Sequence, residues 1–198
     1  MKEPEEQSLE SAGLKVGFDF RGDRFGHEIR IADGPRWLVA LRSIEDAPAA
    51  EWPMSPPLQS LHFESSDEHG RVALLVGMAG HAHWSASVRI QSGQMHFDIA
   101  CRLRGDCSGT LESCYETSLP VSAHDERQAW LALPGTSNRA LRVRLDDQWQ
   151  QSRLTVIPSG LAVIASLPLT LPPGNHTVRW GYSVAVENAP GGVVTRDR

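Results

Sequence analysis

The chain has 198 residues, of which 40% are hydrophobic and 22% are charged, and its formal net charge is −5. This composition indicates a folded globular chain of one larger or two small domains. The acidic balance argues against nucleic-acid binding, which usually requires a basic surface, and no apolar stretch is long enough to span a membrane. The acidic N-terminus also lacks the apolar core of a signal peptide, so we expect a cytoplasmic protein.

The chain contains three cysteines, Cys101, Cys107 and Cys114, at wide spacing. They form neither a CxxC motif nor the ligand set of a zinc site. We therefore expect reduced thiols, and no cofactor is implied. Only in an oxidising compartment would we expect a disulfide, between Cys107 and Cys114.

The N-terminal part predicts a short tail and then a series of strands. Residues 1–13 are acidic and polar, which predicts a disordered tail. Strands with alternating apolar residues are expected at 15–20, 25–31, 37–44, 58–64 and 71–77. Between them, residues 45–57 hold four prolines within ten positions, which excludes a helix or a central strand. Trp52 in this segment predicts either a binding loop or a plug over one end of the core.

The segment 71–77, RVALLVG, is an almost unbroken apolar run. Such a run is typical of a strand that is buried on both faces. Gly77 and Gly80 then predict a break or bulge in the chain before the next element.

The stretch from His81 to Arg104 predicts a long β-hairpin. Apolar and polar residues alternate in both arms, which is the period of a strand with one buried face. Ser92-Gly93 fits a two-residue turn, and this turn pairs Gln91 with Gln94 and so sets the register. The expected apolar pairs are Ile90–Met95, Val88–Phe97, Ala86–Ile99 and Trp84–Cys101.

The rest of the chain predicts further strands and at most one short helix. Strands are expected at 109–117, 129–133, 140–145, 149–157, 161–167 and 176–187. Residues 122–130 are the helical candidate, with Ser122 as its cap, although they also fit a loop that enters the strand at 129–133. Residues 189–198 predict a flexible tail.

Many short strands with turn signals between them predict an all-β fold. We expect a single large antiparallel β-sandwich of roughly ten to twelve strands over residues 14–188. Two small β domains divided near Pro120 are the alternative. In architecture alone, such a sandwich resembles carbohydrate-binding modules and the mutarotase-type supersandwich, and this resemblance implies no particular catalytic residue.

The polar face of the 81–104 hairpin is the candidate site. In the expected register it pairs Arg89–His96, Ser87–Asp98, His83–Arg102 and His81–Arg104. His81 and His83 share a face and are candidate metal ligands, but the arginines opposite them disfavour a cation. Alternatively, the face is an ordinary solvated sheet surface or a second packing interface.

A third interpretation is that this face binds a carbohydrate or a small anion. Arginine binds carboxylates and phosphates, while Asp, His and Ser bond hydroxyl groups. The candidate ligand-binding residues are His83, Ser87, His96, Asp98, Arg102, Arg104 and Trp52. Trp52 and Trp37 are the candidates for stacking on a sugar, because Trp84 lies on the apolar face.

The sequence therefore predicts, first, a non-catalytic module that binds a carbohydrate or small anion. The second hypothesis is a sugar-modifying enzyme of the mutarotase or epimerase type, with His83, His96 or Asp98 as acid–base groups. The third is a structural or protein-interaction module that forms a homodimer through an exposed sheet face. Motifs of hydrolases, nucleotide-binding proteins and metalloproteases are absent from the sequence.

Overall fold

The structure is a computed structural model, and it describes residues 7–45, 53–66, 70–104, 110–136, 138–148, 151–166 and 174–189. Within these ranges the chain forms fifteen β-strands and no helix, so the described chain has no helix that could cross a membrane. The strands are β1 (Ser8–Ser11), β2 (Leu14–Phe20), β3 (Phe25–Asp33), β4 (Arg36–Ser43), β5 (Leu58–Ser66), β6 (Gly70–Ala79), β7 (Ala82–Gln91), β8 (Gln94–Arg104), β9 (Thr110–Glu116), β10 (Val121–His124), β11 (Gln128–Ala132), β12 (Arg139–Leu145), β13 (Ser152–Ile157), β14 (Gly160–Ser166) and β15 (Asn175–Asn188). The predicted all-β fold is confirmed.

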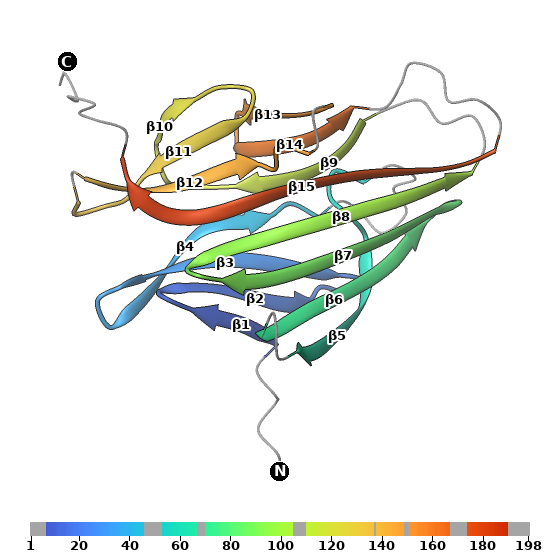
Figure 1. The fold of residues 1–198 in the computed structure, drawn as a ribbon, viewed down its shortest axis with the longest axis horizontal. Helices are drawn as coiled ribbons and strands as arrows, with labels where there is room; N and C mark the ends of the chain where they lie inside the picture. Colours follow the sequence, from blue (N-terminus) through green and yellow to red (C-terminus); the bar gives the residue numbers. More distant parts are fainter. Residues whose placement is uncertain are drawn as a thin grey trace, which may run out of the picture.

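The strands form two antiparallel sheets that pack against each other as a sandwich (Figure 1). One sheet has seven strands in the order β1-β2-β3-β4-β9-β14-β13. The other has eight strands in the order β10-β11-β12-β15-β8-β7-β6-β5. Each sheet takes strands from both sides of Pro120, so the chain is one sandwich and not two small domains divided at that residue.

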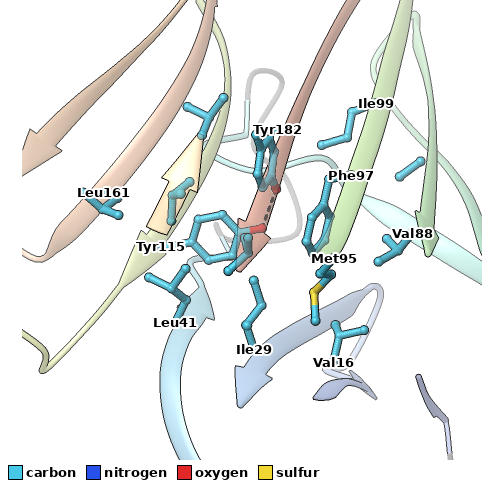
Figure 2. Packing of buried hydrophobic residues seen from close by; sticks show 14 of the residues in the cluster. Val16, Ile29, Leu41, Val88, Met95, Phe97, Ile99, Tyr115, Leu161 and Tyr182 are labelled. Carbon is cyan, nitrogen blue, oxygen red and sulfur yellow. Dashed lines mark hydrogen bonds between the residues drawn. The ribbon is translucent and has the colours of Figure 1, made fainter. Parts of the chain in front are cut away.

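The core lies between the two sheets and consists of their inward-facing residues (Figure 2). Val16, Ile29 and Leu41 contribute from the seven-stranded sheet, and Val88 and Phe97 from the eight-stranded sheet, all with 2% or less of their surface exposed. Each such side chain stabilises the fold by about 1.5–3 kcal/mol through burial. The same alternation that forms the core turns every second residue of a strand outward.

The central hairpin has the predicted register. Strands β7 and β8 pair Gln91 with Gln94 and Val88 with Phe97, and the other predicted apolar pairs also form. Ser92 and Gly93 have φ values of 52° and 75°, as expected of a two-residue turn whose twist matches that of the strands. The polar face of the hairpin is therefore the outer face of the eight-stranded sheet.

Three short strands form in the stretches where the sequence predicts a tail and a helix. Within the predicted tail 1–13, residues 8–11 form β1, because Leu9 packs into the core with 4% of its surface exposed. Within the predicted helix 122–130, the carboxylate of Asp125 accepts the backbone N–H groups of Arg127 and Gln128 at 2.7 and 2.9 Å. This local capping of a turn competes with a helix and leaves β10 and β11 on either side. These short strands account for most of the difference between the fifteen strands observed in the described residues and the ten to twelve expected.

Strand β6 is buried on one face only, which differs from the prediction for 71–77. Ala73 and Leu75 are in the core, whereas 54% of Val76 and 47% of Met78 are exposed on the outer face. The apolar run therefore marks a strand of an antiparallel sheet with one solvated face, and not a strand covered on both sides.

Candidate functional site

The outer polar face of the hairpin is formed by β7 and β8. His83, Ser87, His96, Asp98 and Arg102 lie on it and are exposed or half-buried. The predicted pairs Arg89–His96, Ser87–Asp98 and His83–Arg102 all form. The predicted pair His81–Arg104 does not form, because β7 begins only at Ala82 and the ladder ends at His83–Arg102.

The predicted site residues do not form one site. His96 and Arg102 are six residues apart on β8, which separates them by about 20 Å in an extended strand. His83 lies beside Arg102 at one end of the hairpin, and Arg89 lies beside His96 at the other. In the middle, the carboxylate of Asp98 forms an ion pair with Arg179 of β15 at 2.8 Å. A small ligand can therefore contact one end of this face, not all of it.

The end that carries His96 has a hollow of about 300 Å³ that opens to solvent. A hollow of this size is at the lower limit of small-molecule sites. It is lined by Gln94 and His96 of β8, Arg144 and Leu145 of β12, Ser183 of β15, and Asp146, Asp147 and Gln148 of the turn that follows β12. We call it the His96 hollow.

The hollow exists because a small residue stands between two long ones. Across three neighbouring strands, His96 pairs with Ser183 and Ser183 pairs with Arg144. Ser183 is buried, with 5% of its surface exposed, and its hydroxyl lies 3.5 Å from the carbonyl oxygen of Arg144. The serine thus forms a polar floor, and His96 and Arg144 form two walls.

Charges of both signs act on the His96 hollow. Burial lowers the pKa of His96, the charge of Arg89 lowers it further, and Asp146 opposes both effects. Burial raises the pKa of Asp146, an effect that His96 and Arg89 oppose and that Asp98 and Asp147 reinforce. Near neutral pH, His96 is therefore uncharged and can donate one hydrogen bond and accept another.

Arg89 and Arg144 differ in how much of their bonding capacity is already used. Arg144 forms an ion pair with Asp147 at 2.9 Å. The Nε of Arg89 is buried and has no hydrogen-bond partner among the described residues. Arg89 is not among the residues that line the hollow, and its buried Nε is out of reach of a ligand there, so Arg89 acts on His96 through its charge.

The other end of the hairpin, which carries His83 and Arg102, offers fewer groups that a ligand could bind. His81 and His83 are there, but no group of three or more His, Cys, Asp or Glu side chains in the described ranges is arranged to hold a metal ion. Arg104 ends β8 and pairs with Asn175 of β15, and its side chain lies outside the described part of the structure.

Neither tryptophan predicted for sugar stacking can be placed at the hollow. Trp52 and Cys107 lie outside the described residues. Trp37 belongs to β4 of the seven-stranded sheet, so it cannot reach a ligand on the outer face of the other sheet. That face does carry Trp130 of β11, but the guanidinium of Arg142 lies 5.3 Å from its ring centre and the ring is buried.

Several residues of the hollow were not among the predicted site residues. Gln94 could have been found, because it lies on the same face of the predicted strand as His96, two residues away. Asp146 and Ser183 could not, because they join His96 only through the pairing of β15 with both β8 and β12. No local turn sets that register, so the sequence pattern alone does not contain it.

A second hollow, of about 330 Å³, lies where β4 and β9 separate. Its charged residues already bind one another, since Arg42 forms ion pairs with Glu116 at 3.0 Å and with Glu28 at 2.7 Å. The hydroxyl of Thr117 donates to the carbonyl oxygen of Ala40 at 2.6 Å. This hollow thus presents fewer polar groups to a ligand than the His96 hollow.

Comparison of the chain with protein-family models, curated proteins and solved structures found no match.

Proposed function

We propose that the chain is a non-catalytic binding domain for a small carbohydrate, and that the His96 hollow is its binding site. The observation that carries the proposal is the convergence of donors and acceptors at one solvent-open hollow. Arg144 and Gln94 offer donors, Asp146 offers an acceptor, and His96 offers one of each. Sugar hydroxyl groups, which both donate and accept, match such a mixed set.

A simple anion, the other ligand class that the sequence suggests, fits less well. Arg89 would attract it, but the carboxylates of Asp146 and Asp147 would repel it. Hydroxyl groups can use the same carboxylates as acceptors. We therefore favour a neutral carbohydrate, or one with a single acidic group that reaches Arg144.

The enzymatic alternative, a mutarotase- or epimerase-like activity, has less support. Asp98 is engaged by Arg179, and His83 lies at the far end of the hairpin. His96 is the only predicted acid–base residue at the hollow.

The interaction alternative is favoured by one observation, the exposed Val76 and Met78 on the outer face of β6. A cytoplasmic location is also part of the proposal, in keeping with the small number of cysteines.

A thermal-shift screen of the full chain tests the proposal. The panel contains neutral sugars, amino sugars, sugar acids, sugar phosphates and dicarboxylates. A ligand at about 100 times its dissociation constant adds about 2.7 kcal/mol to the free energy of unfolding, which corresponds to about 5–10 °C for a domain of this size. We expect this shift with a carbohydrate.

Site variants then locate the binding. Arg144→Gln and Asp146→Asn should weaken the affinity at least about tenfold, because each removes a charge-assisted hydrogen bond. His83→Ala and Arg102→Ala, at the far end of the same hairpin, are the matched controls and should change it less than about twofold. Binding that survives both hollow variants, or that is lost in the controls, would overturn the proposed site. Sugar turnover that is lost in His96→Ala, or a concentration-dependent mass with no ligand response, would replace the proposal with one of the two alternatives.

A further inference from the structure

A chain of hydrogen bonds crosses the core from one sheet to the other. Tyr115 of β9 and Tyr182 of β15 belong to different sheets, and their hydroxyl oxygens are 2.5 Å apart (Figure 2). The Nε2 of His27, on β3, lies 2.7 Å from the same hydroxyl of Tyr115. Both tyrosines are buried, with 1% or less of their surface exposed. The three side chains thus join the two sheets through polar contacts inside an apolar core.

The direction of these hydrogen bonds depends on the protonation of His27. In the neutral tautomer that carries its hydrogen on Nδ1, the imidazole accepts through Nε2, and Tyr115 then donates to His27 and accepts from Tyr182. A protonated imidazole has hydrogens on both nitrogens and can only donate. Tyr115 would then have to turn its own hydrogen towards Tyr182. One proton on His27 therefore reorders the whole link between the sheets.

The surroundings of His27 do not stabilise a positive charge. Its neighbours are Phe18 and Asp19 of β2, Arg21 of the following turn, Phe97 of β8, Tyr115 of β9, and Ser43 and Glu45 at the end of β4 and beyond it. Asp19 is already paired with Arg21 at 2.6 Å. Burial lowers the pKa of His27 to about 4, with Arg21 adding to the effect and Asp19 opposing it.

The carboxyl group of Glu45 forms no ion pair with His27. One oxygen of its carboxyl group accepts a hydrogen bond from Ser43 at 2.7 Å, and the hydroxyl of Ser43 accepts the backbone N–H of His27. The other oxygen is buried and has no hydrogen-bond partner among the described residues. Burial raises the pKa of Glu45, which favours its uncharged form.

One wall beside His27 lies outside the two sheets. A cavity of about 10 Å³, room for about one water molecule, lies between the sheets and is bordered by His27, Glu45, Ser55 and Pro56. The segment 53–57 that forms this wall belongs to no strand. Ser55 ties it to β9 through bonds of its hydroxyl with the backbone of Cys114, at 3.2 and 3.3 Å. This wall is the part of the core that can open with the smallest loss of sheet structure.

We propose that His27 is an acid-sensitive latch: when it takes up a proton, the link between Tyr115 and Tyr182 reorders and the sandwich opens locally at 53–58, which exposes aromatic core surface. The latch is independent of ligand binding at the His96 hollow. It provides a way for an acidic environment to change the surface that this chain presents.

The pH range over which the latch opens follows from the direction in which the pKa of His27 is shifted. The ordinary pKa of His27 is 6.5 and the pKa in the closed state is about 4, so the closed state binds the proton more weakly than the open state. The closed state is at full stability above about pH 6.5 and loses stability as the pH falls to about 4. The difference of about 2.5 units corresponds to a change of about 300-fold in the ratio of open to closed protein.

Hydrogen exchange of the full chain between pH 7.5 and 4, corrected for intrinsic exchange, tests the latch. We expect exchange of the amides of Met54, Ser55 and Leu58, and of the Cys114 amide that bonds Ser55, to rise as the pH falls below 6.5 in the wild type and to stay flat in His27→Gln. His83→Gln, which alters an exposed histidine on the outer face, is the matched control and should behave as the wild type does. A wild type without the rise, or a rise that persists in His27→Gln, would refute the latch.

A second measurement keeps the test valid where His27→Gln folds poorly. The imidazole of His27, followed by NMR in the folded wild type, should remain neutral down to about pH 5. In Tyr115→Phe the neutral ring loses its hydrogen-bond donor, so the titration should move towards 6.5. Titration of His27 above pH 6 in the folded wild type would contradict the proposal.

Discussion

Replacing Gly77 with alanine is expected to destabilise the sandwich by about 3 kcal/mol or more. A Cβ at this position would lie 1.8 Å from the carbonyl oxygen of Pro57 and 2.9 Å from the backbone nitrogen of Gln59. Both obstacles are backbone atoms of the chain at the start of β5, where the register with β6 shifts between Leu58 and Ser60. Strand β5 would have to move for the methyl group to fit. Urea denaturation followed by tryptophan fluorescence measures the loss.

A second strand glycine provides the control for this prediction. Gly17 of β2 has nothing within 4 Å of the position of an added Cβ. Gly17→Ala should therefore be neutral or stabilise the protein by up to about 1 kcal/mol, because alanine has less conformational freedom to lose on folding. Equal free energies of unfolding for the two variants would show that the backbone of β5 does not approach Gly77 as described.

Replacing Phe97 with alanine is expected to cost about 3–5 kcal/mol of stability. The ring of Phe97 is buried, with 2% exposed, and it stacks on Tyr182 at 4.8 Å with an angle of 10° between the planes. It also lies 5.5 Å from the ring of His27. The variant therefore leaves a void next to the polar link between the sheets. The melting temperature should fall by about 6–20 °C.

Met78 provides the matched control, because it is a large apolar residue of the same sheet on the opposite face. With 47% of its surface exposed, Met78→Ala should change stability by no more than about 0.5 kcal/mol. A loss at Met78 as large as that at Phe97 would mean that the outer face of β6 is covered in solution. That result would favour the homodimer hypothesis.

The sequence predicts the parts of the fold that depend on local pattern. The hairpin of β7 and β8 is one example, because Ser92-Gly93 fixes the register and every apolar pair follows from it. Strand β1 is the opposite case. Its polar residues suggest a tail, and its structure depends on the burial of Leu9 in a core that distant strands build. The one-sided burial of β6 likewise depends on what covers the outer face of the sheet, which the run of apolar residues cannot reveal.

The candidate site divides in the same way. The pair Arg89–His96 follows from the hairpin, whereas Asp146 and Ser183 reach His96 only through β15. The latch residue His27 had a visible signal, since it shares the inward parity of Ile29 and Ile31 on β3. The hydrogen-bonded link that includes His27 could not be predicted, because Tyr115 and Tyr182 are 88 and 155 positions further along the chain.

The most direct test of carbohydrate binding at the His96 hollow is an NMR titration of the histidine side chains with mixtures of neutral hexoses, amino sugars and sugar acids. His96 lines the proposed site, while His83 lies on the same face at the other end of the hairpin. If the His96 hollow binds a carbohydrate, at least one mixture moves the His96 resonance in a saturable way and leaves the His83 resonance in place. Saturable movement at His83 with none at His96, or no movement at His96 with any mixture, would contradict it.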